Sequence, residues 1–395
     1  MSDMLVKLWQ YLKGSATAQR YWKNTQKHGV QLSVVEIFEV WKLQSVKIFE
    51  ITFKLTVEKH WRPGVYIDYM FCYSYNFWKM PFISTNDVLK TNQTTVVDFI
   101  LLGFQNLHSF RIPFFILIAT VYTATVAANL LIVFLISSSP NLNSPMYIFL
   151  SHLSISDILI STNVAPNTLR VILLGKTPIP VLGCITQLYF FGATTILECC
   201  LLTVMSYDRY LAICDPLRYS SIMNFKLPNY LVIYSWMVGF LQPLITHTLI
   251  LQLEFCGPNI IDHFFCDVAP LLQLSCSDRT LVQIEVSIVA LFVGLLQFLF
   301  IIITYVLIFY SILHMTSIAG REKAFSTCSS HLAVVCTYYG TLIILYLSPK
   351  RGYSFNLNKM LSLVNTVVTP LFNPIIYSLR NKEIRIAIKK MINIK

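Results

Sequence analysis

Residues 281–313 read LVQIEVSIVALFVGLLQFLFIIITYVLIFYSIL and contain a single charged side chain, Glu285. A helix needs about 20 predominantly apolar residues to cross the hydrocarbon core of a bilayer. A helix is also the form that satisfies every backbone polar group of a single segment inside lipid. The stretch therefore predicts a membrane-spanning helix.

Six further apolar stretches repeat this pattern between short polar breaks. Only 12% of the residues are charged and 55% are hydrophobic, whereas soluble domains carry about 25% charged residues. This composition excludes both a soluble multidomain enzyme and a disordered chain. We therefore predict an all-α bundle of seven transmembrane helices within residues 91–395, with helices at about 112–137, 145–173, 184–213, 229–251, 281–313, 325–348 and 360–378.

Residues 1–90 differ from the rest of the chain. They carry five of the six tryptophans and scattered charges, without an apolar run of spanning length. We expect a poorly ordered extension or a gene-model artefact, with Met80 as a second candidate start. The alternative is an amphipathic helix over 31–56 that lies on the membrane or on the main domain. A signal-peptide pattern is not evident.

The formal net charge is +11, and its distribution predicts the orientation in the plasma membrane. Basic residues set the cytoplasmic side of a membrane protein. They gather in alternate connections and the tail: Arg209, Arg218, Lys226, Arg321, Lys323, Arg380, Lys382, Arg385, Lys389, Lys390 and Lys395. We expect a cytoplasmic C-terminus, an extracellular N-terminus with a glycosylation site at Asn92, and lipid rather than nucleic acid as the partner of these bases.

Four cysteines fall at or near the expected outer surface. Cys184 lies 25 residues before Arg209, about 37 Å along a helix, so the two residues belong at opposite membrane faces. The loop before 281–313 supplies the other three cysteines. Four cysteines allow three pairings, of which we favour Cys184–Cys266 with Cys256–Cys276; free thiols are the alternative.

Two polar motifs lie near the expected inner face. Asp208 and Arg209 lie near the end of the third stretch. Neighbouring opposite charges can offset the cost of burying each charge, and they can exchange partners. The alternative is an ordinary arginine beside the membrane. In the seventh stretch Pro374 follows Asn373, and proline frees a carbonyl and kinks a helix, as a hinge or as a plain structural kink. Isoleucines alternate with bases after residue 382, which predicts a short amphipathic C-terminal helix.

Two carboxylates are expected near the middle of the membrane. Asp157 and Glu198 lie about 18 and 16 Å from the nearest expected membrane face. An ionised carboxylate is costly at this depth. The two groups could share a proton, be neutral and hydrogen-bonded, or hold a structural sodium ion with Asn129, Asn373 and water. We expect no other cofactor.

Six short motifs lie along the chain, at Leu101–Phe104, Pro145–Leu150, Leu153–Asp157, Met205–Leu217, Lys323–Leu332 and Pro374–Asn381. With these motifs the chain resembles a rhodopsin-like (class A) G-protein-coupled receptor, and more narrowly an olfactory receptor, over about residues 91–393. Departures from the family pattern are Ala128, Ser206, Tyr338 and the 90-residue leader. None of these substitutions removes a functional group.

The resemblance implies detection of a small, mostly apolar odorant in the outer half of the bundle, and activation of a heterotrimeric stimulatory olfactory G protein that raises cyclic AMP. The ligand positions it implies carry no charge, which argues against an amine or acid ligand: Phe191, Gly192, Thr195, Ile196, Val289, Val293, Tyr339, Leu342, Tyr346 and Thr366. Its switch and G-protein positions are Asp208, Arg209, Tyr210, Tyr305, Lys323, Asn373, Pro374 and Tyr377.

Two other functions stay open from the sequence, and a third is not expected. A class A receptor for a non-odorant ligand, such as a peptide or metabolite, would share the bundle. A seven-helix transporter or channel would use Asp157 and Glu198 to line a pathway. An enzyme is not expected, because the sequence shows no nucleophile–base arrangement, metal-ligand spacing or phosphate loop.

Overall fold

The computed structural model describes residues 96–104, 110–224, 226–256, 258–347 and 354–393. The expectations for residues 1–90 and for glycosylation at Asn92 lie outside these residues.

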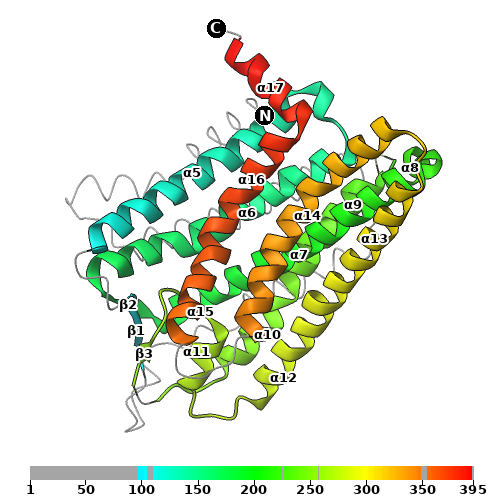
Figure 1. Ribbon diagram of the computed structural model, residues 1–395. Helices are drawn as coiled ribbons and strands as arrows, with labels where there is room; N and C mark the ends of the chain where they lie inside the picture. The colour runs from blue at the N-terminus through cyan, green and yellow to red at the C-terminus, as the bar shows by residue number, and fades with distance from the viewer. Residues whose placement is uncertain (1–95, 105–109, 225, 257, 348–353, 394–395) are drawn as a thin grey trace, which may run out of the picture. The chain divides into compact units, whose positions relative to one another are not determined.

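The described residues form a bundle in which helical segments occupy all seven predicted ranges (Figure 1). The segments are α5 (Arg111–Ser138), α6 (Pro145–Leu174), α7 (Val181–Cys214), α9 (Lys226–Leu241) with α10 (Pro243–Leu251), α12 (Thr280–Val289) with α13 (Leu296–Leu313), α14 (Ile318–Leu347), and α15 (Ser354–Leu363) with α16 (Thr369–Arg380). The predicted C-terminal helix is α17 (Lys382–Asn393). The seven-helix prediction is confirmed.

Some helices begin earlier than their apolar stretch. α14 starts at Ile318 rather than 325, and α15 starts at Ser354 rather than 360. Hydropathy identifies only the part of a helix that is apolar enough to lie in lipid, whereas the helix itself can continue into water for another turn or two. The boundaries therefore differ at the polar ends.

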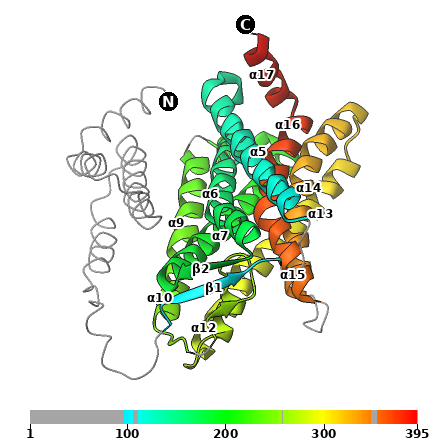
Figure 2. The same cartoon turned by 90° about the vertical axis from the view of Figure 1, so that its left-hand side faces the viewer.

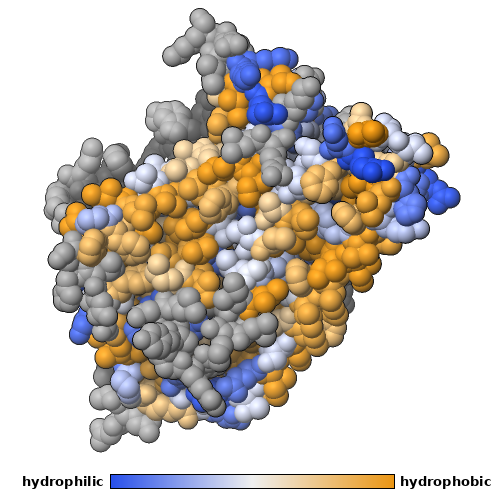
Figure 3. Space-filling view, in the orientation of Figure 1, coloured by the Kyte–Doolittle hydropathy of each residue, from blue (hydrophilic) through white to orange (hydrophobic). Residues whose placement is uncertain are grey.

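Five helices in the described residues are long and apolar enough to cross a membrane: α5, α6, α7, the continuous segment Thr280–Leu313 and the segment Asn358–Ser378. The α9–α10 pair and α14 complete the bundle. Figure 3 shows hydrophobic residues along the sides of the helices and hydrophilic residues near the ends, around α8 (Pro216–Ile222) and α17. This pattern is that of a multi-pass membrane protein.

A small three-stranded sheet lies at the end of the bundle where α7 begins, and it contacts α6 and α7 (Figure 2). Its central strand β1 (Asp98–Leu102) pairs antiparallel with β2 (Lys176–Pro180) and parallel with β3 (Ile260–Ile261). The sequence did not predict this sheet, because its strands are short and their partners lie about 80 and 160 residues apart along the chain. The sheet is an addition to the predicted helical fold.

Two helices contain wider π turns that hydropathy does not register. One is η3 (Ala290–Leu295), between α12 and α13, and the other is η4 (Val364–Val368), between α15 and α16. Single π turns inside α-helices are frequent at functional sites. Val293 lies in η3 and Thr366 lies in η4, so both turns contain residues expected to contact a ligand.

Candidate functional site

The first candidate site is at the carboxyl end of α7, which we call the Arg209 end of the bundle. Arg209 donates from Nη2 to Oδ2 of Asp208 at 2.7 Å. The hydroxyl of Tyr219, on α8, donates to the other carboxylate oxygen at 2.8 Å. The Asp208 side chain is fully buried and that of Arg209 is 13% exposed. Burial, with the adjacent carboxylate, raises the pKa of Tyr219, which keeps its phenol a donor.

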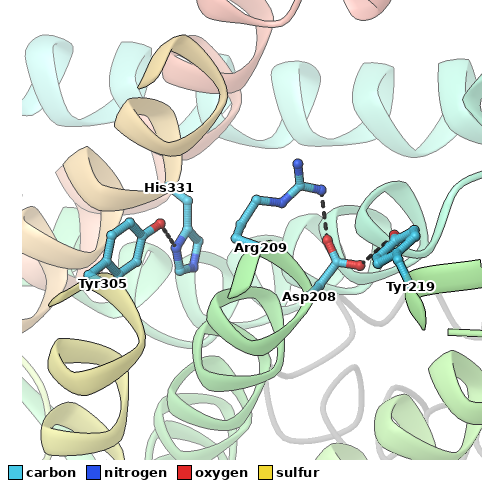
Figure 4. A network of polar contacts seen from close by, with 5 residues as sticks. All are labelled: Asp208, Arg209, Tyr219, Tyr305 and His331. Carbon is cyan, nitrogen blue, oxygen red and sulfur yellow. Dashed lines mark hydrogen bonds and ion pairs between the residues drawn. The ribbon is translucent and has the colours of Figure 1, made fainter. Parts of the chain in front are cut away.

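A second hydrogen-bonded pair lies on the other side of Arg209 (Figure 4). The hydroxyl of Tyr305, on α13, is 2.7 Å from Nδ1 of His331, on α14, and the two rings stack. The Tyr305 hydroxyl is also 3.4 Å from the carbonyl oxygen of Cys328. Arg209 thus stands between one pair that ties α7 to α8 and another that ties α13 to α14. Its Nε is buried without a hydrogen-bond partner among the described residues.

Three further residues expected to act in the switch are Tyr210, Tyr377 and Lys323. Tyr210 packs against a small apolar cluster that includes Ile308 and Cys328. The Tyr377 side chain is 2% exposed, and its hydroxyl has no hydrogen-bond partner among the described residues. Lys323 lies in the second turn of α14. The Arg209 end therefore holds groups whose hydrogen bonds are incomplete.

The second candidate site is the buried polar centre of the bundle. Asn373 donates from Nδ2 to both oxygens of Asp157, at 2.9 and 3.1 Å. Asn129 makes a different contact, because its Nδ2 donates to the carbonyl oxygen of Pro370 at 3.0 Å. Pro370 lies four residues before Pro374, so this carbonyl is the one that the proline leaves free. Asn129, rather than Asn373, therefore satisfies the kink of α16.

Several oxygens in this centre remain unpartnered. Oε1 of Glu198 and Oδ1 of Asn129 are buried without a hydrogen bond among the described residues. Glu198 and Asp157 lie close enough for their charges to interact. The donors of Asn129 are engaged with backbone carbonyls while its oxygen is free. A set of free hard oxygens suits a cation such as sodium or a shared proton.

The third candidate site is the region of the ten expected ligand residues. α7 carries Phe191, Gly192, Thr195 and Ile196, and α14 carries Tyr339, Leu342 and Tyr346; the others are Val289 at the end of α12, Val293 in η3 and Thr366 in η4. The hollows along the outer faces of α12 and α5, about 350 and 540 Å³, are lined by none of these residues.

Contacts among these residues combine aromatic walls with free polar atoms. The Phe191 ring lies 5.1 Å from that of Phe265, and the Tyr339 ring stacks on Phe298 at 4.7 Å. Oγ1 of Thr195 is buried without a hydrogen-bond partner among the described residues. Thr366, in contrast, donates to the carbonyl oxygen of Ser362 at 2.8 Å. Phe265 and Phe298 belong to this region although the sequence did not indicate them.

Two disulfides fix the opposite end of the bundle, which we call the Cys184 end. Cys184 is joined to Cys266 and Cys256 to Cys276, which is the pairing favoured from the sequence. The amide of Cys266 also donates to Oε1 of Gln187 at 3.0 Å. The sequence did not predict the hydrogen bonds of Gln187, Tyr219 and His331. Each of these residues contacts a different segment of the chain, and spacing along the sequence does not predict such contacts.

Comparisons with known proteins agree with these features. A family model described as olfactory receptor matches residues 118–395. The chain is 44% identical to human olfactory receptor 11A1 over 309 residues, which are 78% of this chain and 98% of that protein. It is 46% identical to mouse olfactory receptor 5P60 over 302 residues, 76% of this chain and 93% of that protein.

A structural comparison gives the same fold at a greater distance. The crystal structure of squid rhodopsin superimposes with a TM-score of 0.57 at 15% sequence identity, covering 72% of this chain and 86% of that chain. The Asp208–Arg209 pair and the proline-containing α16 thus lie in a bundle with the fold of that protein. On the family match and the extent of the identity, this chain belongs to the olfactory receptor family of rhodopsin-like G-protein-coupled receptors.

Proposed function

We propose that this receptor detects a small, mostly apolar odorant inside the bundle and activates a stimulatory olfactory G protein, which raises cyclic AMP. The observation that carries the proposal is the network around Arg209. On one side of Arg209 hydrogen bonds join α7 to α8, on the other side a hydrogen bond joins α13 to α14, and all of them can be exchanged without breaking a covalent bond.

The ligand region supports an odorant with one polar group. Phe191, Ile196 and Val293 supply apolar surface, and Oγ1 of Thr195 is a buried hydroxyl oxygen that lacks a partner among the described residues. An unpartnered buried hydroxyl costs about 1–3 kcal/mol, and a carbonyl or alcohol on the ligand would recover part of this cost. Pockets for small molecules usually combine apolar walls with a few such groups.

Activation follows as a population shift. An odorant that binds the active bundle tenfold more tightly than the inactive one favours it by about 1.4 kcal/mol. The Tyr305–His331 bond must break when the Arg209 end of α14 moves outward, and one such hydrogen bond is worth about 0.5–1.5 kcal/mol. The free energy gained from tighter binding to the active bundle is therefore similar to the free energy lost when the Tyr305–His331 hydrogen bond breaks. Arg209 then exchanges Asp208 for new partners, Tyr305 and Tyr377 turn inward, and a cleft for the G protein opens beside Lys323.

The proposed orientation puts the Cys184 end outside the cell and the Arg209 end in the cytosol. The disulfides suit the oxidising side of the membrane. α17 carries Arg385, Lys389 and Lys390, with Ile384 fully buried on its other face. This arrangement suits a short helix on the inner surface, where bases meet anionic lipid headgroups.

We further propose that the buried centre holds a sodium ion. Asp157, Glu198 and the side-chain oxygen of Asn129 would supply the ligands, while Asn373 orients Asp157. A cation there would favour the inactive bundle by linking α5, α6 and α7. Thermal unfolding of the purified receptor tests this: replacing sodium by N-methyl-glucamine should lower the melting temperature, and Glu198→Gln should abolish the difference. Equal melting temperatures would leave a shared proton as the explanation.

An odorant screen tests the main proposal. Cells that display the full chain at the surface should raise cyclic AMP in response to at least one chemical class of volatile compound. Thr195→Val should weaken the response to a polar odorant more than to its hydrocarbon analogue. Silence of a well-displayed receptor across all classes, together with a response to a peptide or metabolite, would favour the non-odorant alternative.

A further inference from the structure

Lys359 is a lysine buried at the Cys184 end of the bundle, on α15. Its side chain is only 4% exposed, which is unusual for an ammonium group unless it is paired. Nζ lies 2.5 Å from Oδ1 of Asp262 and 3.3 Å from the carbonyl oxygen of Gly103. Neither the proposed function nor the switch network uses this contact.

The three residues belong to three separate segments. Gly103 directly follows β1, and Asp262 directly follows β3. These strands pair with each other in the sheet, with Ile100 opposite Ile260. The Lys359 ammonium therefore ties the beginning of the seventh helix to the edge of the sheet. Asp262 is 45% exposed, so the outer partner of the pair remains in contact with solvent.

The segment between Asp262 and Cys266 is held at both ends. Cys266 is fixed to α7 by its disulfide with Cys184, and Asp262 is held by Lys359. The three residues between them, His263, Phe264 and Phe265, are all at most 6% exposed. We name residues 262–266 the lid segment.

The lid segment lies against the proposed ligand region. The Phe265 ring is 5.1 Å from the ring of Phe191, and Phe264 stacks on Phe104 at 5.7 Å. Lys359 also precedes Thr366 by seven residues, which is about 10 Å along a helix. The lysine thus stands two turns above a residue expected to contact the ligand.

We propose that Lys359 and Asp262 form a latch that holds the lid segment over the ligand region, and that the latch must open for a ligand to enter or leave. The disulfide is the fixed end and the ion pair the releasable end. Lys359 is a positioning residue in this proposal, because it contacts the lid rather than the ligand. The role as a gate for an odorant rests on the proposed function.

Accessibility of the ligand region tests the latch without an odorant or a G protein. The full chain carrying Thr195→Cys is displayed on intact cells and treated with a charged, membrane-impermeant methanethiosulfonate reagent. The fraction still unmodified is read afterwards by biotin–maleimide labelling and compared with the same chain without the substitution, which gives the background from native cysteines. With the latch closed, modification at position 195 should be slow.

Removing either partner should open the region. Lys359→Met and Asp262→Asn should each raise the rate of modification about tenfold, and the double variant should be no faster than either single variant, because the two residues act through one contact. Glu254→Gln removes an exposed carboxylate at the same end and should leave the rate unchanged. If the Lys359→Met variant does not reach the cell surface, Asp262→Asn is used alone, because the Asp262 side chain is 45% exposed and its replacement should disturb folding less.

Two results would overturn the latch. One is a rate in both single variants equal to that of the parent, and the other is a double variant whose acceleration is the product of the two single effects. A receptor that fails every odorant test but shows the expected accelerations would refute the proposed ligand and keep the latch. The reverse outcome would refute the latch alone.

Discussion

The two ends of the bundle are held together in different ways. At the Cys184 end two disulfides, a three-stranded sheet and the Lys359–Asp262 pair cross-link the connections. At the Arg209 end the contacts between the described residues are hydrogen bonds and the ion pairs of Asp208 and Asp215, and Arg209 and Tyr377 keep buried polar atoms without partners among those residues. A structure that must change shape is expected to keep exchangeable contacts where it moves and fixed contacts where it does not.

The difference assigns the two ends different tasks. Under the proposed function, the fixed end keeps the expected ligand region assembled, and the exchangeable end adopts a second arrangement at a cost of a few hydrogen bonds. Four substitutions test this contrast, and no expected change is larger than the one before it.

Cys184→Ser should have the largest effect, because it removes a bond between residues 82 apart in the sequence. Loss of a native disulfide typically costs about 2–5 kcal/mol, so most of the receptor should fail to reach the cell surface. Cys336→Ser removes a free, exposed cysteine and is the matched control. Equal surface display of the two variants, measured by flow cytometry, would show that the Cys184 end does not depend on its covalent link.

Asp208→Asn should weaken the hold on Arg209 and leave a buried cation without its anion. We expect basal cyclic AMP to rise about tenfold, equivalent to a shift of about 1.4 kcal/mol toward the active bundle. Asp215→Asn is the control, because the Asp215–Arg218 pair is exposed and 3.9 Å long, and should change little. Unchanged basal signalling in Asp208→Asn at equal surface display would contradict the switch assigned to Arg209.

His263 should make the Cys184 end sensitive to acid. Burial, with the nearby Lys359 charge, lowers the pKa of His263 from 6.5 to about 3. Between these two pKa values His263 binds a proton in the unfolded chain but not in the folded chain. The free energy of unfolding is therefore highest above pH 6.5 and falls as the pH drops toward 3. Between pH 7.5 and 5.5 this amounts to about 1.4 kcal/mol.

Thermal unfolding of the purified receptor at these two pH values measures the effect. His263→Gln should reduce the difference in melting temperature, whereas His314→Gln, at an exposed position of the Arg209 end, should leave it unchanged. An identical pH dependence in His263→Gln and the parent would show that His263 does not supply the acid sensitivity.

Tyr305→Phe should have the smallest effect, because it removes one hydroxyl and its bond to His331. A single hydrogen bond is worth about 0.5–1.5 kcal/mol, so basal cyclic AMP should rise only a few-fold. Tyr310→Phe, on the same helix at an exposed position, is the control and should have no effect. A larger change in Tyr310→Phe than in Tyr305→Phe would place the restraint on α14 elsewhere.

Much of this receptor was predictable from its sequence. The apolar stretches place all seven spanning helices, because the free energy of moving a side chain into lipid depends mainly on that side chain and its immediate neighbours. The amphipathic pattern after residue 382 predicted α17, and the Asp208–Arg209 pair was visible because its members are adjacent. These features all depend on local information.

The contacts that define the sites were decided only by the tertiary structure. Asn129 meets the carbonyl of Pro370 across 241 residues, and Lys359 meets that of Gly103 across 256. Hydropathy predicts which segments enter the membrane but not which faces of two helices contact each other, since the contacts between helices depend on how all their side chains pack together. The sequence alone therefore determined the spanning helices, while packing decided which polar atoms are satisfied, which are left free, and where the chain can open.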